Sequence, residues 1–476
     1  MGSGASAGLE AVVKECSDAE LQSFLKSLPP DSKAKLQEAL QKPPPHVVIE
    51  EKQGKEGGKT LLVILSSPMG AHSATSNVGK SFCTAYSEKF PDDTIKVIDC
   101  LALEQFTCAR VQAKFKLFGG DPNAGDGEKE WLYTKKLIED FKAADKYVVL
   151  APMWNLWIPN QLKLYIDHLV QPALTFSMPD VKGMVTGKPI LFIRASGGVP
   201  IESDIDFGTK YLKAIFSFIG FTDMRVLGIS PTANQEGLPA LLEEKSKEAA
   251  GVAANFEFNA DAKPDPPVAT TLPESTPAEI KEGSKVLLIT SSPLGDYSVT
   301  LGASKEFLKV LEEKSKATVT TLDLSDGKME PFTAARVQGK FATWGGGKDA
   351  AKDNKEWAVT TALIEQMKDA DVYVFAVPMW NLAIPYQLKL WLDHVVQPHQ
   401  TFNPMTNSGL LEGKRAFVIA SSGNGLLGSP VDHVTPFMQG ILGFIGVSDV
   451  TFSLINKGKE GIAEAVTKLK AAVKLE

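Results

Sequence analysis

Cysteine is scarce in this chain, with four residues among 476. Cys16, Cys83, Cys100 and Cys108 all precede the second half of the sequence, and none has CxxC spacing. A disulfide framework or a zinc site would need paired or clustered cysteines. We therefore expect reduced thiols, which indicate a cytoplasmic protein, and no metal site.

Long apolar runs and an excess of basic charge are also missing. No apolar run reaches the ~18 residues that a membrane span needs, and the N-terminus lacks the charged and apolar blocks of a signal peptide. The formal net charge is -7, and the basic residues form no stripe that could follow a nucleic-acid backbone. We therefore expect neither a transmembrane segment nor a nucleic-acid partner.

The N-terminal region has its own organisation. Gly2 and Ser6 fit the short pattern for N-myristoylation at Gly2, although a disordered Gly/Ser-rich start is the alternative. Ser17 with Glu20 resembles a helix capping box, and a helical hairpin is predicted over residues 1–42. Residues 43–59 are rich in Pro, Lys, Glu and Gly, and predict an extended, solvated linker.

One stretch of the sequence occurs twice. Residues 151–164 and 377–390 share Pro-Met-Trp-Asn-Leu followed by Ile-Pro-x-Gln-Leu-Lys-Leu. Each copy follows a short apolar run that predicts a buried strand, and leads into an amphipathic run that predicts a helix. The same order of segments surrounds both copies, so we expect two homologous domains, 60–256 and 284–476, joined by a proline-rich linker, 257–283.

The first repeat alternates predicted strands and helices. The strands are expected at 60–65, 94–99, 147–151, 189–195 and 224–229, and the helices near 75–88, 128–144, 159–170, 204–220 and 236–254. Five βα units predict a parallel sheet covered by helices on both faces. The fold class is therefore α/β, with two tandem doubly wound domains whose strand order is 2-1-3-4-5, the flavodoxin-like arrangement.

Both repeats carry an unusually long connection after their second strand, at residues 101–127 and 324–354. Each contains Phe-Thr-x-Ala-Arg-Val-Gln-x-Lys-Phe and then glycines. A connection of this length is typical of a functional flap or an interface arm, and the alternative is a surface excursion with one short helix.

Hydroxyl side chains gather between the first strand and the first helix, in residues 66–76, which we call the hydroxyl turn. Hydroxyl and N–H groups at a helix N-terminus can hold an anion such as a phosphate monoester, whereas ordinary N-capping would explain only one hydroxyl. A rival pattern, Ala74 to Ser81, fits a relaxed P-loop. That pattern begins too far after the strand, which would place Gly79 and Lys80 inside the helix.

Two more loops are expected at the same sheet edge, because the carboxyl ends of parallel strands meet there. One is the repeated tryptophan turn, residues 153–158 and 379–384. Its alternative interpretation is structural, with the tryptophan only filling the strand-to-helix turn. The other is the glycine loop, residues 195–198 and 421–424, where glycine permits close backbone approach. Together, the three loops predict a pocket for a mononucleotide with a flat ring.

These motifs resemble those of the FMN-dependent NADH-azoreductases, also called FMN-dependent NADH:quinone oxidoreductases. The resemblance covers both repeats and includes Thr175-Phe176, Gly187-Lys188 and Gly220-Phe221-Thr222-Asp223. It implies a flavodoxin-like fold, non-covalent FMN, NADH or NADPH as electron donor, and ping-pong two-electron reduction of quinones or azo compounds. It implies no catalytic side chain, because the flavin carries the chemistry.

The resemblance also assigns cofactor-binding residues in each repeat. In the first repeat these are Ser67, Ser73, Thr75 and Ser76 for the phosphate, Met153, Trp154, Asn155 and Leu156 along the ring, and Ala195, Ser196, Gly197 and Gly198 on its far side. In the second they are Ser292, Ser298 and Thr300, then Met379, Trp380, Asn381 and Leu382, then Ser421, Ser422, Gly423 and Asn424.

The second repeat departs from this pattern. Leu301 and Gly302 replace Ser76 and Asn77, and Asn424 interrupts the glycine pair, so up to two FMN are expected with the second site weaker. Because family members are homodimers, the two repeats are expected to form an intramolecular pseudo-dimer. The alternative is a binding or scaffold protein with partly degenerate flavin sites, and a one-electron carrier is disfavoured.

An Asp-His pair occurs in the helix after each tryptophan turn, at Asp167-His168 and Asp393-His394. One interpretation is a role in proton delivery. The other is structural, with the pair fastening the helix to the core.

Overall fold

The computed structural model describes residues 49–266, 278–423 and 425–475. The predicted helical hairpin, Gly2, residues 43–48, the centre of the proline-rich linker and Asn424 lie outside these ranges. In the described ranges, no helix combines the length and the hydropathy that crossing a membrane requires.

The first repeat contains the predicted five-stranded parallel sheet, in the order β2-β1-β3-β4-β5. Strand β1 lies between β2 and β3, with Val63 opposite Val97 of β2 and Val148 of β3. The prediction of an α/β fold with order 2-1-3-4-5 is confirmed. The strands are β1 (Thr60–Leu65), β2 (Thr94–Asp99), β3 (Lys146–Pro152), β4 (Pro189–Ala195) and β5 (Asp223–Ile229).

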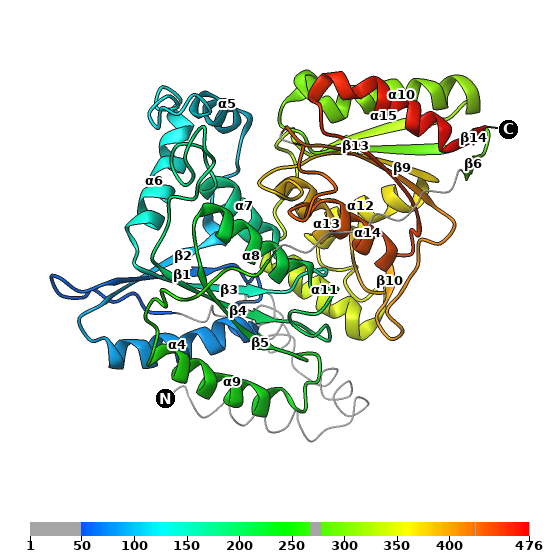
Figure 1. Ribbon diagram of the computed structural model, residues 1–476. Helices are drawn as coiled ribbons and strands as arrows, with labels where there is room; N and C mark the ends of the chain where they lie inside the picture. Colours follow the sequence, from blue (N-terminus) through cyan, green and yellow to red (C-terminus); the bar gives the residue numbers. More distant parts are fainter. Residues whose placement is uncertain (1–48, 267–277, 424, 476) are drawn as a thin grey trace, which may run out of the picture. The chain divides into compact units, whose positions relative to one another are not determined.

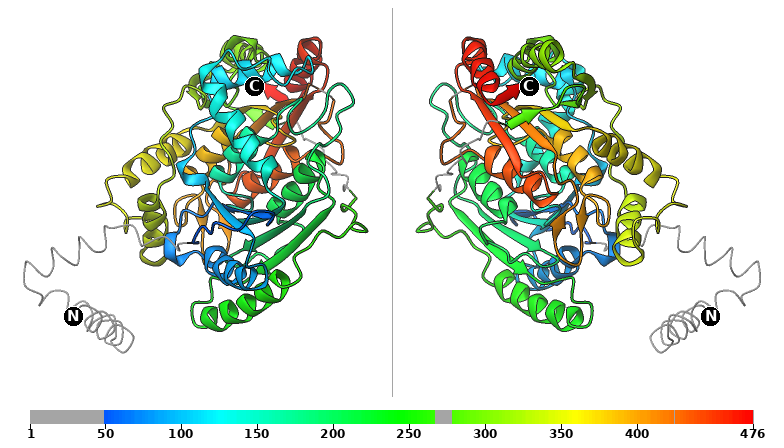
Figure 2. Two further views of the ribbon diagram at one scale, coloured as in Figure 1. Left: turned by 90° about the vertical axis from the view of Figure 1, so that its left-hand side faces the viewer. Right: turned by 90° about the vertical axis from the view of Figure 1, so that its right-hand side faces the viewer.

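Helices cover both faces of this sheet, as the continuous burial of β1, β3 and β4 requires (Figure 1). Leu61 and Val63 face α4 (Ala74–Lys89) and α9 (Leu238–Ala253), which lie side by side (Figures 1 and 2). Leu62 and Ile64 face the other layer. That layer consists of α6 (Lys129–Ala143), α7 (Asn160–Leu169) and α8 (Phe207–Ile219).

The second repeat has the same architecture, with strand order β13-β12-β9-β7-β8. Its strands are β7 (Lys285–Thr290), β8 (Thr318–Asp323), β9 (Val372–Pro378), β12 (Arg415–Ser421) and β13 (Asp449–Ile455). One face packs on α10 (Val299–Ser315) and α15 (Ile462–Ala471). The other packs on α12 (Trp357–Asp369), α13 (Tyr386–Val395) and α14 (Thr435–Phe444).

Each long connection contains one helix, α5 (Cys108–Leu117) in the first repeat and α11 (Ala334–Gly346) in the second. Two short strand pairs were not predicted. They are β6 (Ala278–Ile280) with β14 (Val473–Leu475), and β10 (Phe402–Asn403) with β11 (Ser408–Gly409).

A single hydrophobic core joins the two repeats. The cluster that contains Phe141 and Trp157 of the first repeat also contains Trp391 and Phe437 of the second. Trp157 stacks on Phe437 with ring centroids 4.9 Å apart. Both repeats consequently lie within one compact unit, as a pseudo-dimer requires.

The described part of the expected N-terminal linker is extended but not free in solvent. Lys52 pairs with Ile95 through two backbone hydrogen bonds, and the Gly54 N–H donates to Thr94 Oγ1 at 3.0 Å. Residues 49–59 therefore cover the outer edge of β2, which would otherwise present unpaired N–H and C=O groups. Charged composition predicted solvation here, whereas the exposed strand edge provides partners for the backbone.

Two backbone segments cross in close contact in each domain, at Gly183 and Gly220 in the first and at Gly409 and Gly446 in the second. A Cβ atom on Gly183 would lie 2.3 Å from the Gly220 nitrogen at the end of α8. The equivalent atom on Gly409 would lie 1.9 Å from the Gly446 nitrogen. Gly220 and Gly446 themselves have φ of 119° and 97°. Only glycine fits this crossing in either repeat.

We predict that Gly183→Ala lowers the free energy of unfolding by roughly 3 kcal/mol, because the methyl group meets backbone atoms that have no room to move. Denaturant titration would measure this change. Gly251→Ala is the control, since it lies in α9 and its Cβ would meet nothing within 4 Å. The free energy of unfolding of this control is expected to rise by about 0.5 to 1 kcal/mol. Equal midpoints for the two variants would contradict the close crossing.

Candidate functional site

The three predicted loops of the first repeat meet at the carboxyl edge of its sheet. They follow β1, β3 and β4, which are adjacent strands. The Met153 N–H donates to the Ala195 carbonyl at 2.6 Å, and the Ser66 hydroxyl donates to the Leu150 carbonyl at 2.8 Å. In the second repeat the Met379 N–H donates to the Ser421 carbonyl at 2.7 Å. The structure therefore brings the predicted loops together in both halves.

The hydroxyl turn of the first repeat gathers three hydroxyls at the N-terminus of α4. Ser73 caps the helix, and its Oγ accepts from the Ser76 N–H at 3.2 Å and from the Ser76 hydroxyl at 3.0 Å. Thr75 Oγ1 lies 3.0 Å from the same oxygen. Ser67 is also buried, and its Oγ accepts the Met69 N–H at 3.4 Å. The helix dipole and these donors favour an anion at this position.

The P-loop interpretation is wrong. Gly79 and Lys80 lie inside α4, and a Cβ at Gly79 would lie 2.6 Å from the Leu150 side chain. Gly79 therefore serves the close packing of helix on sheet, and does not form a phosphate-binding loop.

The hydroxyl turn of the second repeat is similar but poorer. Ser298 caps α10 through the Leu301 N–H at 3.2 Å, and Thr300 Oγ1 lies 3.0 Å from Ser298 Oγ. Leu301 occupies the position of Ser76, so one hydroxyl is lost. The buried Ser292 Oγ has no hydrogen-bond partner among the described residues. A buried hydroxyl without a partner is costly, so Ser292 Oγ has a hydrogen bond to offer to a ligand.

The tryptophan turn is a tight reversal held by two backbone hydrogen bonds. The Trp154 N–H donates to the Trp157 carbonyl at 2.8 Å, and the Trp157 N–H donates back at 3.2 Å. The two residues between them, Asn155 and Leu156, have φ of 52° and 63°. The left-handed conformation is uncommon for a residue such as Leu156, so the turn stores strain. The second repeat has the same turn, with φ of 52° at Asn381 and 66° at Leu382.

The glycine loop provides an open surface opposite the tryptophan turn. The Ser196 N–H donates to the Ile229 carbonyl at 3.0 Å, which continues the sheet, and Gly197 and Gly198 are exposed. A Cβ on Gly198 would meet nothing within 4 Å, as is also true of Gly423. The loop therefore leaves room for a ligand without a clash, although its glycines are not needed to avoid one.

A buried arginine lies beneath the tryptophan turn of the first repeat and has no counterpart in the second. Arg194 on β4 donates to the Ala151 carbonyl at 2.8 Å and pairs with Asp206 at 3.1 Å. Both side chains are fully buried. The second repeat has Ala420 at the equivalent position, so the two sites differ beneath the turn as well as in the hydroxyl turn.

The opposite repeat also contacts each tryptophan turn. Asp393 of α13 accepts the Asn155 Nδ2–H at 2.9 Å, and its other oxygen accepts the Asn160 backbone N–H at 3.3 Å. Lys340 of α11 donates to Asn155 Oδ1 at 2.9 Å, and its ammonium lies 5.0 Å from the Trp154 ring centroid. The long connections are therefore interface arms that each carry one short helix.

The mirror-image contacts occur at the second turn. Asp167 of α7 accepts the Asn381 Nδ2–H at 2.8 Å and the Tyr386 backbone N–H at 3.3 Å. Lys114 of α5 donates to Asn381 Oδ1 at 2.9 Å and lies 4.8 Å from the Trp380 ring centroid.

Lys114 and Lys340 were missed in the sequence analysis, and Asp167 and Asp393 were noted there only as partners of the adjacent histidines. The only signal was their repetition, as Gln-x-Lys-Phe and Leu-Lys-Leu-x-x-Asp-His, because distances across the interface are not visible in a sequence.

Burial shifts the titration of this network. Desolvation lowers the pKa of Lys114 to about 7 and that of Lys340 to about 7. Desolvation also lowers the pKa of Lys163, which pairs with Asp167 one helical turn away, and raises the pKa of Asp167. The lysines are neutralised more easily here than in water.

The two histidines beside these aspartates are structural. His168 Nδ1 lies 2.8 Å from Thr134 Oγ1, and its Nε2 lies 2.9 Å from the Glu104 carbonyl. Burial lowers the pKa of His168 to about 4, so it stays neutral near pH 7. The predicted pairing is partly wrong: the histidine fastens α7 to its own repeat, whereas Asp167 faces the other repeat.

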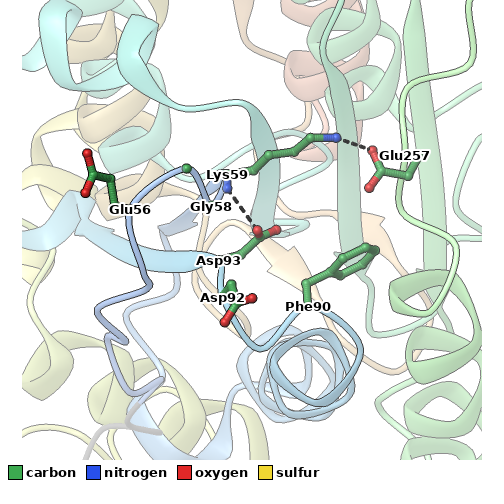
Figure 3. Close-up of a pocket in the computed structure, with 8 residues that line it drawn as sticks. Glu56, Gly58, Lys59, Phe90, Asp92, Asp93 and Glu257 are labelled. Atoms are coloured by element: carbon green, nitrogen blue, oxygen red, sulfur yellow. Dashed lines mark hydrogen bonds and ion pairs between the residues drawn. The ribbon is translucent and has the colours of Figure 1, made fainter.

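The structure has one cavity away from these loops and another whose lining includes Pro293, next to Ser292. One of about 350 Å³ lies at the opposite, amino edge of the first sheet. There the Lys59 ammonium points to Glu257, and the Lys59 backbone N–H donates to Asp93 (Figure 3). The other, of about 230 Å³, lies between the repeats and is lined by Phe106, Cys108 and Tyr386 among others. Within the described ranges, no group of three or more His, Cys, Asp or Glu could hold a metal ion.

Comparisons with known proteins agree with this architecture. A family model described as Flavodoxin-like fold matches residues 59–251 and 284–474. A protein of Nitratidesulfovibrio vulgaris (strain DP4), called FMN-dependent NADH:quinone oxidoreductase, is 41% identical over 199 residues, which cover 40% of this chain and 94% of the relative. A relative of the same description from Shewanella oneidensis is 36% identical, covering 40% of this chain and 97% of its own.

A solved structure also matches. It is an FMN-dependent NADH-azoreductase from Bacillus anthracis str. Ames Ancestor in complex with FMN, 27% identical, with 41% of this chain and 100% of that chain covered and a TM-score of 0.36.

We predict that the stability of the chain rises with pH because of Lys114 and Lys340. Their folded pKa of about 7 lies below the ordinary 10.5, so the unfolded chain binds more protons between these values. The free energy of unfolding, relative to the double variant Lys114→Met/Lys340→Met, should rise from about pH 7 to about pH 9. The slope is at most about 1.4 kcal/mol per pH unit for each lysine.

Denaturant titrations at several pH values would measure the difference. Lys116→Met, an exposed residue on the same helix, is the control and should follow the unmodified chain. Parallel pH curves for the unmodified chain and the double variant would contradict the prediction.

Proposed function

Because the chain belongs to the flavodoxin-like fold family and, within it, to the FMN-dependent NADH:quinone oxidoreductases as a tandem repeat, we propose that it is an FMN-dependent oxidoreductase. The proposed reaction passes two electrons from NADH or NADPH to a quinone or an azo compound by a ping-pong mechanism. The family membership rests on matches to both repeats and on relatives that the chain covers almost completely.

The observation that carries the proposal is the convergence of the hydroxyl turn, the tryptophan turn and the glycine loop at one sheet edge. Their chemistry fits FMN. Buried hydroxyls at a helix N-terminus suit its phosphate, the unpartnered Ser292 Oγ suits a phosphate acceptor, and the exposed glycines leave room for a ring.

We assign the residues as follows. Ser67, Ser73, Thr75 and Ser76 would hold the phosphate in the first repeat, residues 153–156 would lie along the ring, and residues 195–198 would line its far side. The second repeat would use Ser292, Ser298 and Thr300 with residues 379–382 and 421–424. When bound, FMN would supply the two-electron chemistry, and the protein would position it and the substrate.

The two repeats would act as an intramolecular pseudo-dimer, with up to two FMN per chain. We retain 60–256 and 284–476 as the domains that carry these sites, preceded by the segments 1–42 and 43–59 and joined by residues 257–283. The first site would bind FMN more tightly, since it has an additional hydroxyl from Ser76 and the buried Arg194 beneath its turn.

The direct test is the visible spectrum of the purified chain, with FMN added during reconstitution. We expect flavin absorption that NADH or NADPH bleaches and that a quinone restores, with up to two FMN per chain. A colourless protein that binds no FMN would contradict the proposal and favour the scaffold alternative.

The difference between the sites gives a second prediction. Ser76→Ala should weaken FMN binding at the tighter site by roughly tenfold, which corresponds to one hydrogen bond to a charged group. Thr84→Ala is the control, because Thr84 lies on the same helix and its exposed hydroxyl donates to Lys80. Titration of the apoprotein with FMN, followed by flavin fluorescence, would measure both. Identical affinities for the two variants would contradict the assignment of Ser76.

A further inference from the structure

The tryptophan turn is only partly secured by its own repeat. Asn155 and Leu156 are both left-handed, and such residues persist only when their surroundings hold them. The repeat itself supplies the two backbone hydrogen bonds between Trp154 and Trp157. It supplies no side-chain cap to the following helix, because Pro159 is the N-cap residue of α7. Arg194 holds the end of the preceding strand, whereas the side chain of Asn155 is bonded by the opposite repeat.

One carboxylate of the opposite repeat spans the turn and the helix start. Asp393 Oδ1 accepts from the Asn155 side chain, while Oδ2 accepts the backbone N–H and the Nδ2–H of Asn160, at 3.3 and 3.0 Å. Pro159 has no side-chain acceptor for the first N–H groups of α7, and the Asp393 carboxylate supplies that acceptor instead. It also fixes the spacing between the turn and α7.

Lys340 fixes the other end of the Asn155 amide. Its ammonium donates to Asn155 Oδ1 at 2.9 Å and to the Val396 carbonyl at 3.1 Å, and the side chain is buried. Because Asp393 takes the NH2 group and Lys340 the oxygen, only one orientation of the amide satisfies both. The side chain of a left-handed residue is thus held from both ends by the other repeat.

The second turn repeats this arrangement with the roles of the repeats exchanged. Asn381 lies between Asp167 and Lys114, and Pro385 is again an N-cap residue without a side-chain bond. Asp167 supplies the missing acceptor to the Tyr386 N–H. The same geometry therefore occurs at both turns.

The energetics also point to positioning and not to adhesion alone. Burying charges is costly, and well-packed apolar side chains in their place often give equal or greater stability. The interface already has an apolar core around Trp157 and Phe437. The buried aspartates and lysines are therefore not needed to hold the two repeats together. Their presence is explained if they impose one geometry on the turn.

We propose that Asp393 and Lys340 are positioning residues for the tryptophan turn of the first repeat, and that Asp167 and Lys114 do the same for the second. Each tryptophan turn is therefore positioned by the opposite repeat. The consequence for FMN rests on the proposed function, whereas the positioning of the turn does not.

The test replaces each of the two lysines by methionine, in two separate variants of the full chain. Lys340→Met and Lys114→Met are compared by hydrogen exchange of residues 152–160 and 378–386, without added flavin. We expect Lys340→Met to speed exchange in 152–160 by roughly tenfold and to leave 378–386 unchanged. Lys114→Met should do the reverse, so each effect appears in the repeat that does not carry the substitution.

Matched variants separate positioning from a general loss of structure. Lys116→Met, on the same helix as Lys114 but exposed, should change neither segment. Lys340→Arg keeps a charged donor and should restore slow exchange. Asn155→Gly permits the left-handed conformation but removes both contacts, so it should speed exchange in 152–160 even if Lys340→Met fails to fold.

Titration of the same variants with FMN is the second measurement. Lys340→Met should weaken FMN binding at the first site by roughly tenfold, and Lys114→Met at the second. Crossed effects in hydrogen exchange support the proposal. If they occur in a chain that binds no FMN, the proposed function fails and the positioning stands. Faster exchange only in the substituted repeat, or equally in both, would overturn the proposal.

Discussion

Two buried carboxylates, Asp167 and Asp393, are the contacts on which the functional edge of this protein depends. Each projects from a helix of one repeat and accepts hydrogen bonds from the tryptophan turn and helix start of the other. Their own lysine partners, Lys163 and Lys389, lie one turn earlier on the same helices. Because a buried carboxylate must be fully hydrogen bonded, these contacts impose the pseudo-dimer geometry as well as the shape of each turn.

The fusion of two repeats has a physical consequence for the sites. In a homodimer the two interface halves are identical, but a single chain allows them to differ. Here the first repeat has Ser76 and Arg194 where the second has Leu301 and Ala420. The contacts across the interface nevertheless remain symmetric, with Lys114 and Lys340 in matching positions. Each half therefore retains the parts that the other half's turn requires.

Much of the architecture could be predicted from local pattern. Strands β1, β2 and β4 begin and end where the apolar runs placed them, and α4 differs from its expected range by one residue at each end. Glycines and prolines marked the loops, and the repetition supplied the second domain without further argument. The short strands β6, β10, β11 and β14 could not be predicted, because they have two or three residues and depend on partners distant in sequence.

The sequence by itself determined the fold class, the strand order and the identity of the three loops at the carboxyl edge, because hydrophobic periodicity and chain connectivity act locally. Only the tertiary structure decided that residues 49–59 cover β2 and that His168 and Asp167 face opposite ways. It alone revealed that Lys340 reaches Asn155 across 185 positions of sequence. Such contacts depend on how two packed domains meet, and no local pattern encodes that distance.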